Sequence, residues 1–241
     1  MALQIKHADE IAEDVSDRLW SLYGQIAHTI LERANGEDLA EKRFFVKIDG
    51  RVISGQIDTL SLDHGVLSDW KFTTSWGFMA GREPKPEWIA QLNMQAFLLE
   101  ANGYKVSDLQ IIGLLRDWQI NEAKKNQDYP QSPIVKMQIG WWTREITMSF
   151  IKDRIAAHLK AMESLPLCTD EERWARPGGW AVMKPGGKRA VKIVSTKEEA
   201  QDIASQYPGG KVEERRGIAM RCENYCNVNK FCSQYKESIN G

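Results

Sequence analysis

The sequence predicts an α/β fold in which a mixed central β-sheet is flanked by helices. The main observation is the order of elements over residues 1–166, where a helix, three strands, a helix, two strands and a helix follow one another. Three β-rich runs are separated by Asp49-Gly50 and by Asp63-His64-Gly65, and such glycine-containing pairs favour the backbone angles of tight hairpin turns. We therefore expect a single mixed sheet in the first part of the chain.

The elements of this core follow from hydrophobic periodicity and turn signals. Apolar residues from Ile11 to Leu31 recur near helical spacing, which predicts a helix over residues 8–35. An antiparallel meander follows, with strands near residues 43–48, 51–60 and 65–72. Further along the chain, we predict helices over residues 84–103 and 144–164 and strands over residues 108–118 and 134–142.

The remainder of the chain, residues 167–241, is expected to form a second domain, a small α+β module that follows the core of residues 1–166. Short strands fit two runs within residues 178–195 and one run at residues 211–216. Thr196 is placed to cap a helix, and Glu199 completes a capping box.

Composition and charge place the chain among ordinary globular proteins. Hydrophobic residues make up 42% of its 241 residues and charged residues 27%. The formal net charge is −1, so a nucleic-acid enzyme would have to build its positive surface locally. No apolar stretch approaches the roughly 20 residues that a membrane-spanning helix needs, and the first residues lack a signal-peptide core. We expect a cytoplasmic protein with no membrane partner.

Two acidic residues and a lysine form the sharpest functional pattern. Gly55-Gln-Ile-Asp58 is followed by Asp69-Trp-Lys71. Residues two apart on a strand point to the same face, so Asp69 and Lys71 project together, and a hairpin would bring Asp58 beside them. Two carboxylates held close repel each other, and a divalent cation makes that arrangement favourable. The alternative is that these are exposed charges on a polar strand.

A histidine on the first predicted helix extends the pattern. Gly24-x-x-x-His28, then Gly55-x-x-Asp58, then Asp69-x-Lys71 resemble, in this order, the RecB-like branch of the PD-(D/E)XK nuclease superfamily. That family has a restriction-endonuclease-like core, and the predicted α-β-β-β-α-β order matches it. The alternative for His28 is a satisfied core histidine.

The resemblance implies a set of ligands and catalytic groups. His28, Asp58, Asp69 and the backbone carbonyl of Trp70 would bind Mg²⁺ or Mn²⁺, and Lys71 would assist catalysis. Glu32 lies one helical turn beyond His28 and is a candidate for a further ligand or for a residue that supports one.

The helix after the lysine carries another family feature. Members of the family have a glutamine there, followed four residues later by a tyrosine. Gln91 fits the glutamine, but Gln95 occupies the tyrosine position, which is a departure. We assign Gln91 to the catalytic site, and its alternative is a polar residue on the outside of the helix.

Four cysteines suggest a second metal site. Three of them, Cys222, Cys226 and Cys232, are clustered, and Cys168 is the fourth. Four thiolates suit structural zinc or an iron–sulfur cluster equally well in number. Zinc sites usually contain Cys-x-x-Cys pairs, which are absent, and the pattern resembles the iron–sulfur nucleases of the RecB-like group. We therefore expect a [4Fe-4S] cluster, with Zn²⁺ and free thiols as alternatives, although in those relatives the solitary cysteine commonly precedes the nuclease motifs.

The resemblance also implies a substrate. The expected activity is that of a metal-dependent DNA exonuclease that acts on linear ends or single strands in phage or mobile-element recombination, in the host cytoplasm if the chain is phage-encoded. Lys188, Arg189, Arg215 and Arg216 are expected to contact phosphates, unless they form a solvated loop and strand edge. Tryptophans such as Trp76 could stack on unpaired bases, although most tryptophans pack in cores.

Two other functions stay open at this point. One is a structure-specific or nicking endonuclease of the same fold, and the other is a non-catalytic nucleic-acid-binding module. A homo-oligomer or a recombination partner protein is compatible with each of these functions.

Overall fold

The structure, a computed structural model, describes residues 2–11, 14–34, 36 and 38–240. The chain divides into two compact units. The first consists of Asp14–His158, and the second combines Met1–Glu13 with Leu159–Gly241. The N-terminal residues, which the sequence assigns to the nuclease core, thus group with the cysteine-containing unit.

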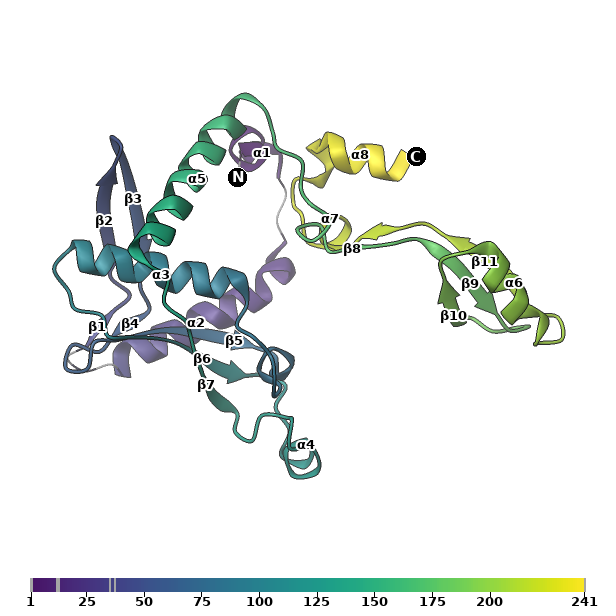
Figure 1. Cartoon of the computed structure of the whole chain (residues 1–241), viewed down its shortest axis with the longest axis horizontal. Helices are drawn as coiled ribbons and strands as arrows, with labels where there is room; N and C mark the ends of the chain where they lie inside the picture. The colour runs from purple at the N-terminus through teal and green to yellow at the C-terminus, as the bar shows by residue number, and fades with distance from the viewer. Residues whose placement is uncertain (1, 12–13, 35, 37, 241) are drawn as a thin grey trace. The chain divides into compact units, whose positions relative to one another are not determined.

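The first unit is built on a five-stranded mixed sheet, as the sequence predicts (Figure 1). Strands β5 and β6 are parallel, and the other neighbouring pairs are antiparallel. In spatial order the strands are β1 (Leu39–Ala40), β4 (Thr59–Leu60), β5 (Val66–Thr73), β6 (Asp108–Leu115) and β7 (Ile134–Gln138).

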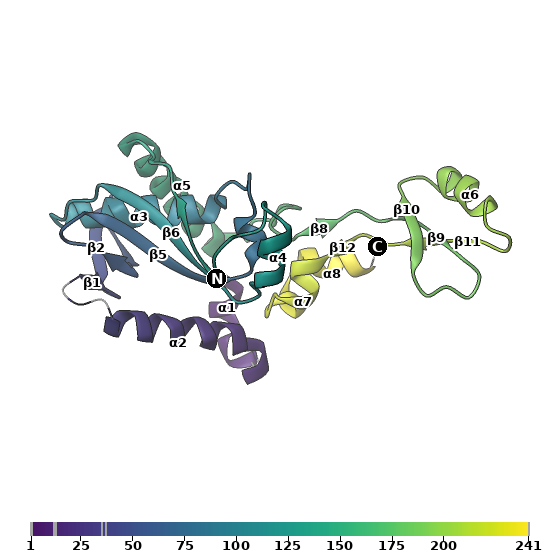
Figure 2. The same ribbon diagram turned by 90° about the horizontal axis from the view of Figure 1, so that it is seen from below.

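Helices lie on both faces of this sheet (Figure 2). Helix α3 (Pro86–Ala101) packs Leu92 into the same buried cluster as Leu67 of β5. Helix α2 (Leu19–Ala34) lies on the opposite face, where the ring of its Tyr23 meets Phe72 of β5. Because Leu67 and Phe72 are an odd number of positions apart on one strand, they belong to opposite faces.

The remaining helices of this unit complete the core. The first part of α5 (Arg144–Glu163) packs Ile151 against Ile48 and Phe97. A short helix, α4 (Ile120–Lys125), and a 3₁₀ turn, η3 (Ser75–Phe78), lie in the connections.

The predicted three-stranded meander is a bent ribbon. Strands β2 (Arg43–Ile48) and β3 (Arg51–Gln56) form a two-stranded sheet of their own, closed by Asp49-Gly50, whose φ angles of 47° and 76° are those of a tight turn. At residues 57–58 the ribbon crosses into the larger sheet, where Thr59 pairs with Ser68. The predicted strand over residues 51–60 is therefore two strands, β3 and β4.

The first predicted helix, over residues 8–35, is shorter than expected. It begins at Leu19, after two 3₁₀ turns, η1 (Ala8–Glu10) and η2 (Val15–Arg18). The side chain of Asp14 accepts a hydrogen bond from the Ser16 amide, which starts a local turn instead of a continuous helix.

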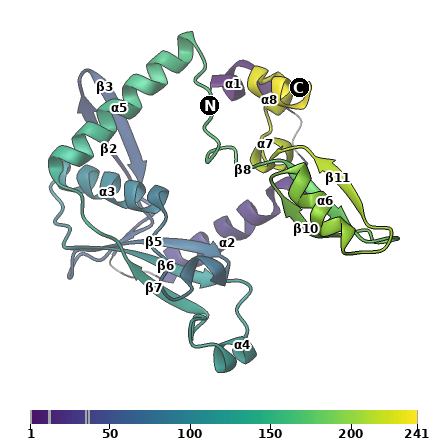
Figure 3. The same cartoon turned by 45° about the vertical axis from the view of Figure 1, so that its right-hand side comes forward.

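The second unit contains a three-stranded antiparallel sheet in the order β10-β9-β11 (Figure 3). Its strands are β9 (Gly179–Met183), β10 (Ala190–Val194) and β11 (Lys211–Arg215). Helix α6 (Lys197–Ser205) packs Ala200 and Ala204 against Val182. The Thr196 hydroxyl accepts a hydrogen bond from the Glu199 amide, which confirms the predicted cap.

Short elements around the cysteines complete this unit. Strands β8 (Ala175–Arg176) and β12 (Ile218–Ala219) are antiparallel partners and are followed by α7 (Met220–Asn224), η4 (Asn229–Phe231) and α8 (Ser233–Asn240). The N-terminal helix α1 (Ala2–Lys6) precedes His7, whose ring stacks on Phe231 at a centroid distance of 3.9 Å. In the described part of the chain, no helix combines the length and the apolar character needed to cross a bilayer.

Candidate metal centre

Asp58 and Asp69 meet at the junction of β4 and β5. The Trp70 amide donates a hydrogen bond of 2.7 Å to Asp58 Oδ2, so the Asp58 carboxylate lies against the peptide bond that follows Asp69. Asp69 is only 1% exposed. The structure therefore brings together the two carboxylates that the sequence selects.

His28 reaches the same place from α2. Its Nδ1 lies 2.8 Å from Glu41 Oε1 and 3.7 Å from Asp58 Oδ2. His28, Glu41 and Asp58 each offer one ligand atom, and these three atoms lie within 4.8 Å of one another. An imidazole and two carboxylates at this spacing suit a divalent cation.

Glu41 is the residue of this centre that the sequence analysis missed. It lies at the bend of the ribbon, where its amide donates a hydrogen bond to the Asp58 carbonyl. Its φ angle is 47°, a conformation that residues with a side chain seldom adopt and that is concentrated at functional sites. Gln56 Nε2 donates a hydrogen bond of 2.6 Å to Glu41 Oε2 and fixes the carboxylate.

Lys71 and Gln91 surround the buried carboxylate of Asp69. Lys71 Nζ lies 2.6 Å from Asp69 Oδ2, and Gln91 Nε2 donates a hydrogen bond of 2.5 Å to Asp69 Oδ1. Lys71 in turn donates to Gln91 Oε1 at 3.1 Å. Gln95 is buried and donates to the Gln56 carbonyl, so it ties α3 to β3.

Burial raises the pKa of both carboxyl groups above the ordinary value of an aspartate. Burial, followed by the nearby Asp69 charge, raises the pKa of Asp58 to about 6, against the opposing effect of the Trp70 amide. Burial also raises the pKa of Asp69, although the Lys71 ammonium acts in the opposite direction. Perturbed pKa values of buried groups beside charged partners are concentrated at functional sites, so these two carboxyl groups mark a candidate site.

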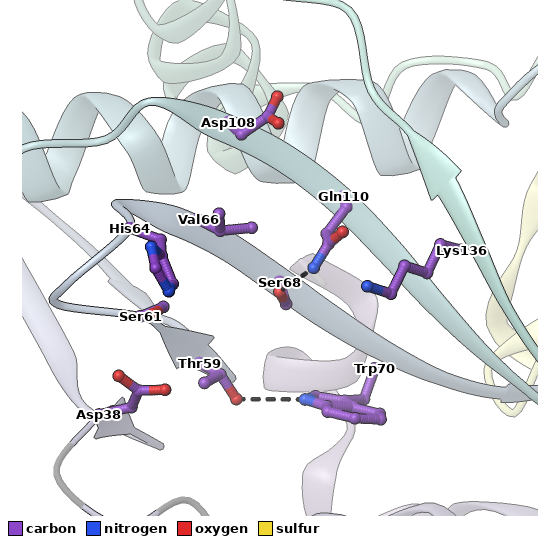
Figure 4. Close-up of a pocket in the computed structure, with 10 residues that line it drawn as sticks. All are labelled: Asp38, Thr59, Ser61, His64, Val66, Ser68, Trp70, Asp108, Gln110 and Lys136. Atoms are coloured by element: carbon purple, nitrogen blue, oxygen red, sulfur yellow. Dashed lines mark hydrogen bonds between the residues drawn. The ribbon is translucent and has the colours of Figure 1, made fainter.

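The backbone and the side chain of Trp70 point in different directions. Its amide points to Asp58, and since the N–H and C=O of a strand residue point to the same side, its carbonyl faces this edge too. Its indole points into a polar hollow of about 340 Å³ on the other face of β5 from Asp69, where Nε1 donates to Thr59 Oγ1 and Gln110 donates to Ser68 (Figure 4). This hollow is separate from the carboxylate cluster.

The other predicted residues lie in α2 and in the second unit. Glu32 lies in α2, and its side chain is outside the part of the chain that the structure describes. The four basic residues belong to the second unit, where Lys188 and Arg189 occupy the exposed β9–β10 connection. Arg215 Nη2 lies 3.9 Å from Met183 Sδ, and Arg216 forms an ion pair with Glu223.

The four cysteines gather in the second unit as free thiols. The pKa of the Cys168 thiol is raised by burial, Glu172, Cys232 and Cys226, and the pKa of Cys222 is raised by burial and by the other three thiols. Cys168 and Cys222 therefore lie close enough to the other cysteines for their own pKa values to be affected. The set matches a four-thiolate centre in number.

Side-chain hydrogen bonds connect the segments that carry the cysteines to one another. Gln234 bonds the amide and the carbonyl of Cys168 through its side chain, and Asn229 Nδ2 donates to the Cys222 carbonyl. The remote Cys168 is thus tied to α8, directly after Cys232.

Comparisons with known proteins match only parts of the chain. Residues 173–215 match a family described as an uncharacterized protein conserved in bacteria (DUF2188). No curated protein matches. The solved structure of SSO0001 is similar over 64% of this chain and 70% of its own, at 14% identity and a TM-score of 0.43. A Eubacterium rectale protein, provisionally named an exonuclease, is 11% identical over 67% of this chain, with a TM-score of 0.37. This chain covers 55% of that protein.

Proposed function

We propose that the unit Asp14–His158 is a divalent-cation-dependent deoxyribonuclease that hydrolyses phosphodiester bonds. The observation that carries this proposal is the convergence of His28, Glu41 and Asp58 within 4.8 Å, beside the buried Asp69–Lys71 pair. Acidic groups beside a lysine suit phosphodiester hydrolysis, because the reaction needs both a cation site and a positive group near the phosphate.

Each residue has a defined part in this proposal. His28, Glu41, Asp58 and Asp69 would hold Mg²⁺ or Mn²⁺ together with the Trp70 carbonyl, and the bound ion would acidify a water molecule and orient the phosphate. The Lys71 ammonium offsets negative charge on the phosphate oxygens and positions the attacking water. Gln91, bonded to both Asp69 and Lys71, keeps these two groups in place.

The finer assignment is an exonuclease that acts on linear ends or single strands in phage or mobile-element recombination. It rests on the resemblance of the ordered His28, Asp58, Asp69 and Lys71 pattern to RecB-like nucleases. The basic residues Lys188, Arg189, Arg215 and Arg216 of the second unit would add phosphate contacts, which supply most sequence-independent affinity.

A hydrolysis assay tests the proposed function. We expect wild-type protein with Mn²⁺ to degrade linear duplex and single-stranded DNA and to leave covalently closed circles intact. Asp69→Asn is expected to lose the activity, whereas Asp63→Asn, which changes an exposed carboxylate in a turn, is expected to retain it. Cutting of circles would replace the exonuclease by an endonuclease, and no wild-type hydrolysis would leave a non-catalytic binding module.

For the second unit, we propose that Cys168, Cys222, Cys226 and Cys232 bind a structural [4Fe-4S] cluster. Support comes from the neighbouring cysteines, which raise the pKa values of Cys168 and Cys222, and from the Gln234 bonds that tie Cys168 to the segment after Cys232. A unit with small hydrophobic clusters gains stability from such a cross-link, because the bound centre ties together distant segments.

Metal analysis of anaerobically purified protein tests this assignment. We expect about four irons per chain and a broad visible absorption band, both lost in Cys222→Ser together with a lower melting temperature. Ser233→Ala, beside Cys232 but without a thiol change, is expected to keep both. One zinc per chain without visible absorption would contradict the iron–sulfur proposal in favour of the zinc alternative.

A further inference from the structure

An exposed tryptophan lies just beyond β5, the strand that carries Asp69 and Lys71. Trp76 is 61% exposed and lies in the 3₁₀ turn that follows β5. The guanidinium of Arg82 lies 3.8 Å from the centroid of its ring. Since the guanidinium covers one face of the indole, the exposure of Trp76 comes from the other face and the ring edges.

The segment that carries this pair is firmly attached to the first unit. The Ser75 amide donates a hydrogen bond of 2.6 Å to Asp117 Oδ1, and the Ala80 amide donates one of 2.8 Å to the Asp128 carbonyl. These two hydrogen bonds fix the backbone on either side of Trp76, whose side chain is exposed.

The same segment is joined to the candidate metal centre. Phe78 packs against Trp88 of α3 at a centroid distance of 5.7 Å, and Trp88 lies about one helical turn before Gln91, which contacts Lys71. Trp76 is five residues beyond Lys71, so even an extended chain separates their Cα atoms by no more than about 18 Å. A single strand bound at Lys71 can therefore reach the indole.

We propose that Trp76 and Arg82 form a stacking subsite for an unpaired base of single-stranded DNA. The inference rests on the proposed function and names its substrate as an unpaired strand. An indole with one open face stacks on any base, because every base has a π-face. Arg82 forms no ion pair within the described residues, so its charge is available to a phosphate. Bases within a duplex are already stacked and paired, so this subsite selects single strands.

Oligonucleotide binding tests the subsite. We use the Lys71→Met background with Mn²⁺, which prevents degradation, and measure fluorescence anisotropy with a labelled dT12 strand and with a blunt hairpin duplex. Trp76→Ala is expected to weaken binding of dT12 by about tenfold and to change duplex binding by less than about twofold. Trp76→Phe is expected to retain most of the affinity. Trp141→Ala, an exposed tryptophan of the same unit, serves as the control and is expected to bind dT12 like the parent.

Several outcomes would overturn the subsite. These are unchanged dT12 binding by Trp76→Ala, an equal loss for the duplex, or an equal loss in Trp141→Ala. If Trp76→Ala fails to fold by circular dichroism, Arg82→Gln carries the same test, with a selective loss of dT12 binding supporting the subsite and no loss overturning it. Hydrolysis by wild type without a Trp76 effect refutes the subsite alone, whereas a Trp76 effect without hydrolysis refutes the deoxyribonuclease alone.

Discussion

Replacing Lys71 by methionine is expected to lower the rate of DNA hydrolysis by about 10²- to 10⁴-fold, the range typical of a lost acid–base or charge-stabilising group. Methionine keeps the aliphatic length but removes the ammonium that lies 2.6 Å from Asp69. The proposed cation ligands stay in place, so Mn²⁺ affinity is expected to change much less than the rate. Single-turnover hydrolysis at saturating Mn²⁺ measures the effect.

The control for this prediction is Lys47→Met, which removes an exposed lysine on β2 of the same unit. It is expected to hydrolyse DNA at about the wild-type rate. A Lys71→Met protein that is folded and as active as Lys47→Met would show that the ammonium has no role in the reaction.

Asp58→Asn is expected to stabilise the metal-free protein while removing a cation ligand. Burial raises the pKa of Asp58 to about 6, so the folded state favours the neutral carboxyl and is penalised when the group ionises. The asparagine removes this penalty. The free energy of unfolding is therefore expected to rise by about 1 to 3 kcal/mol at pH 8. The gain should shrink as the pH falls from about 6 and vanish below about 4, where the carboxyl is neutral in both states.

Urea denaturation with a chelator, repeated across this pH range, measures that gain. Asp63→Asn, in an exposed turn, is expected to show almost no change. With saturating Mn²⁺ the order should reverse, because bound cation stabilises wild type more than the variant. A destabilised metal-free Asp58→Asn protein at pH 8 would contradict the unfavourable burial of this carboxylate.

Much of the fold could be predicted because its signals are local. The Asp49-Gly50 turn, the β-rich run of β5 and the Thr196 cap each depend on a few neighbouring residues. The N-terminal residues could not be placed in this way. Their grouping with the cysteine unit depends on contacts such as His7 on Phe231, more than two hundred positions apart, which no local pattern records.

In the candidate site, too, some residues could be predicted from local sequence signals and others could not. Strand alternation placed Asp69 with Lys71, and the resemblance selected Gln91. Glu41 was missed although the register contains it, since continuing the β2–β3 pairing by two positions from Arg43 and Gln56 places Glu41 opposite Asp58. What the sequence does not give is the bend at Glu41, where a positive φ angle turns its carboxylate towards His28.

The most direct test of the central claim is a titration of metal-free protein with Mn²⁺ at pH 8, with the free ion followed by electron paramagnetic resonance. Wild type and Asp63→Asn are expected to bind Mn²⁺ saturably, and Asp58→Asn is expected to bind it at least about tenfold more weakly. Equal Mn²⁺ affinity in all three proteins would contradict the assignment of a cation to the imidazole and carboxylates of this unit.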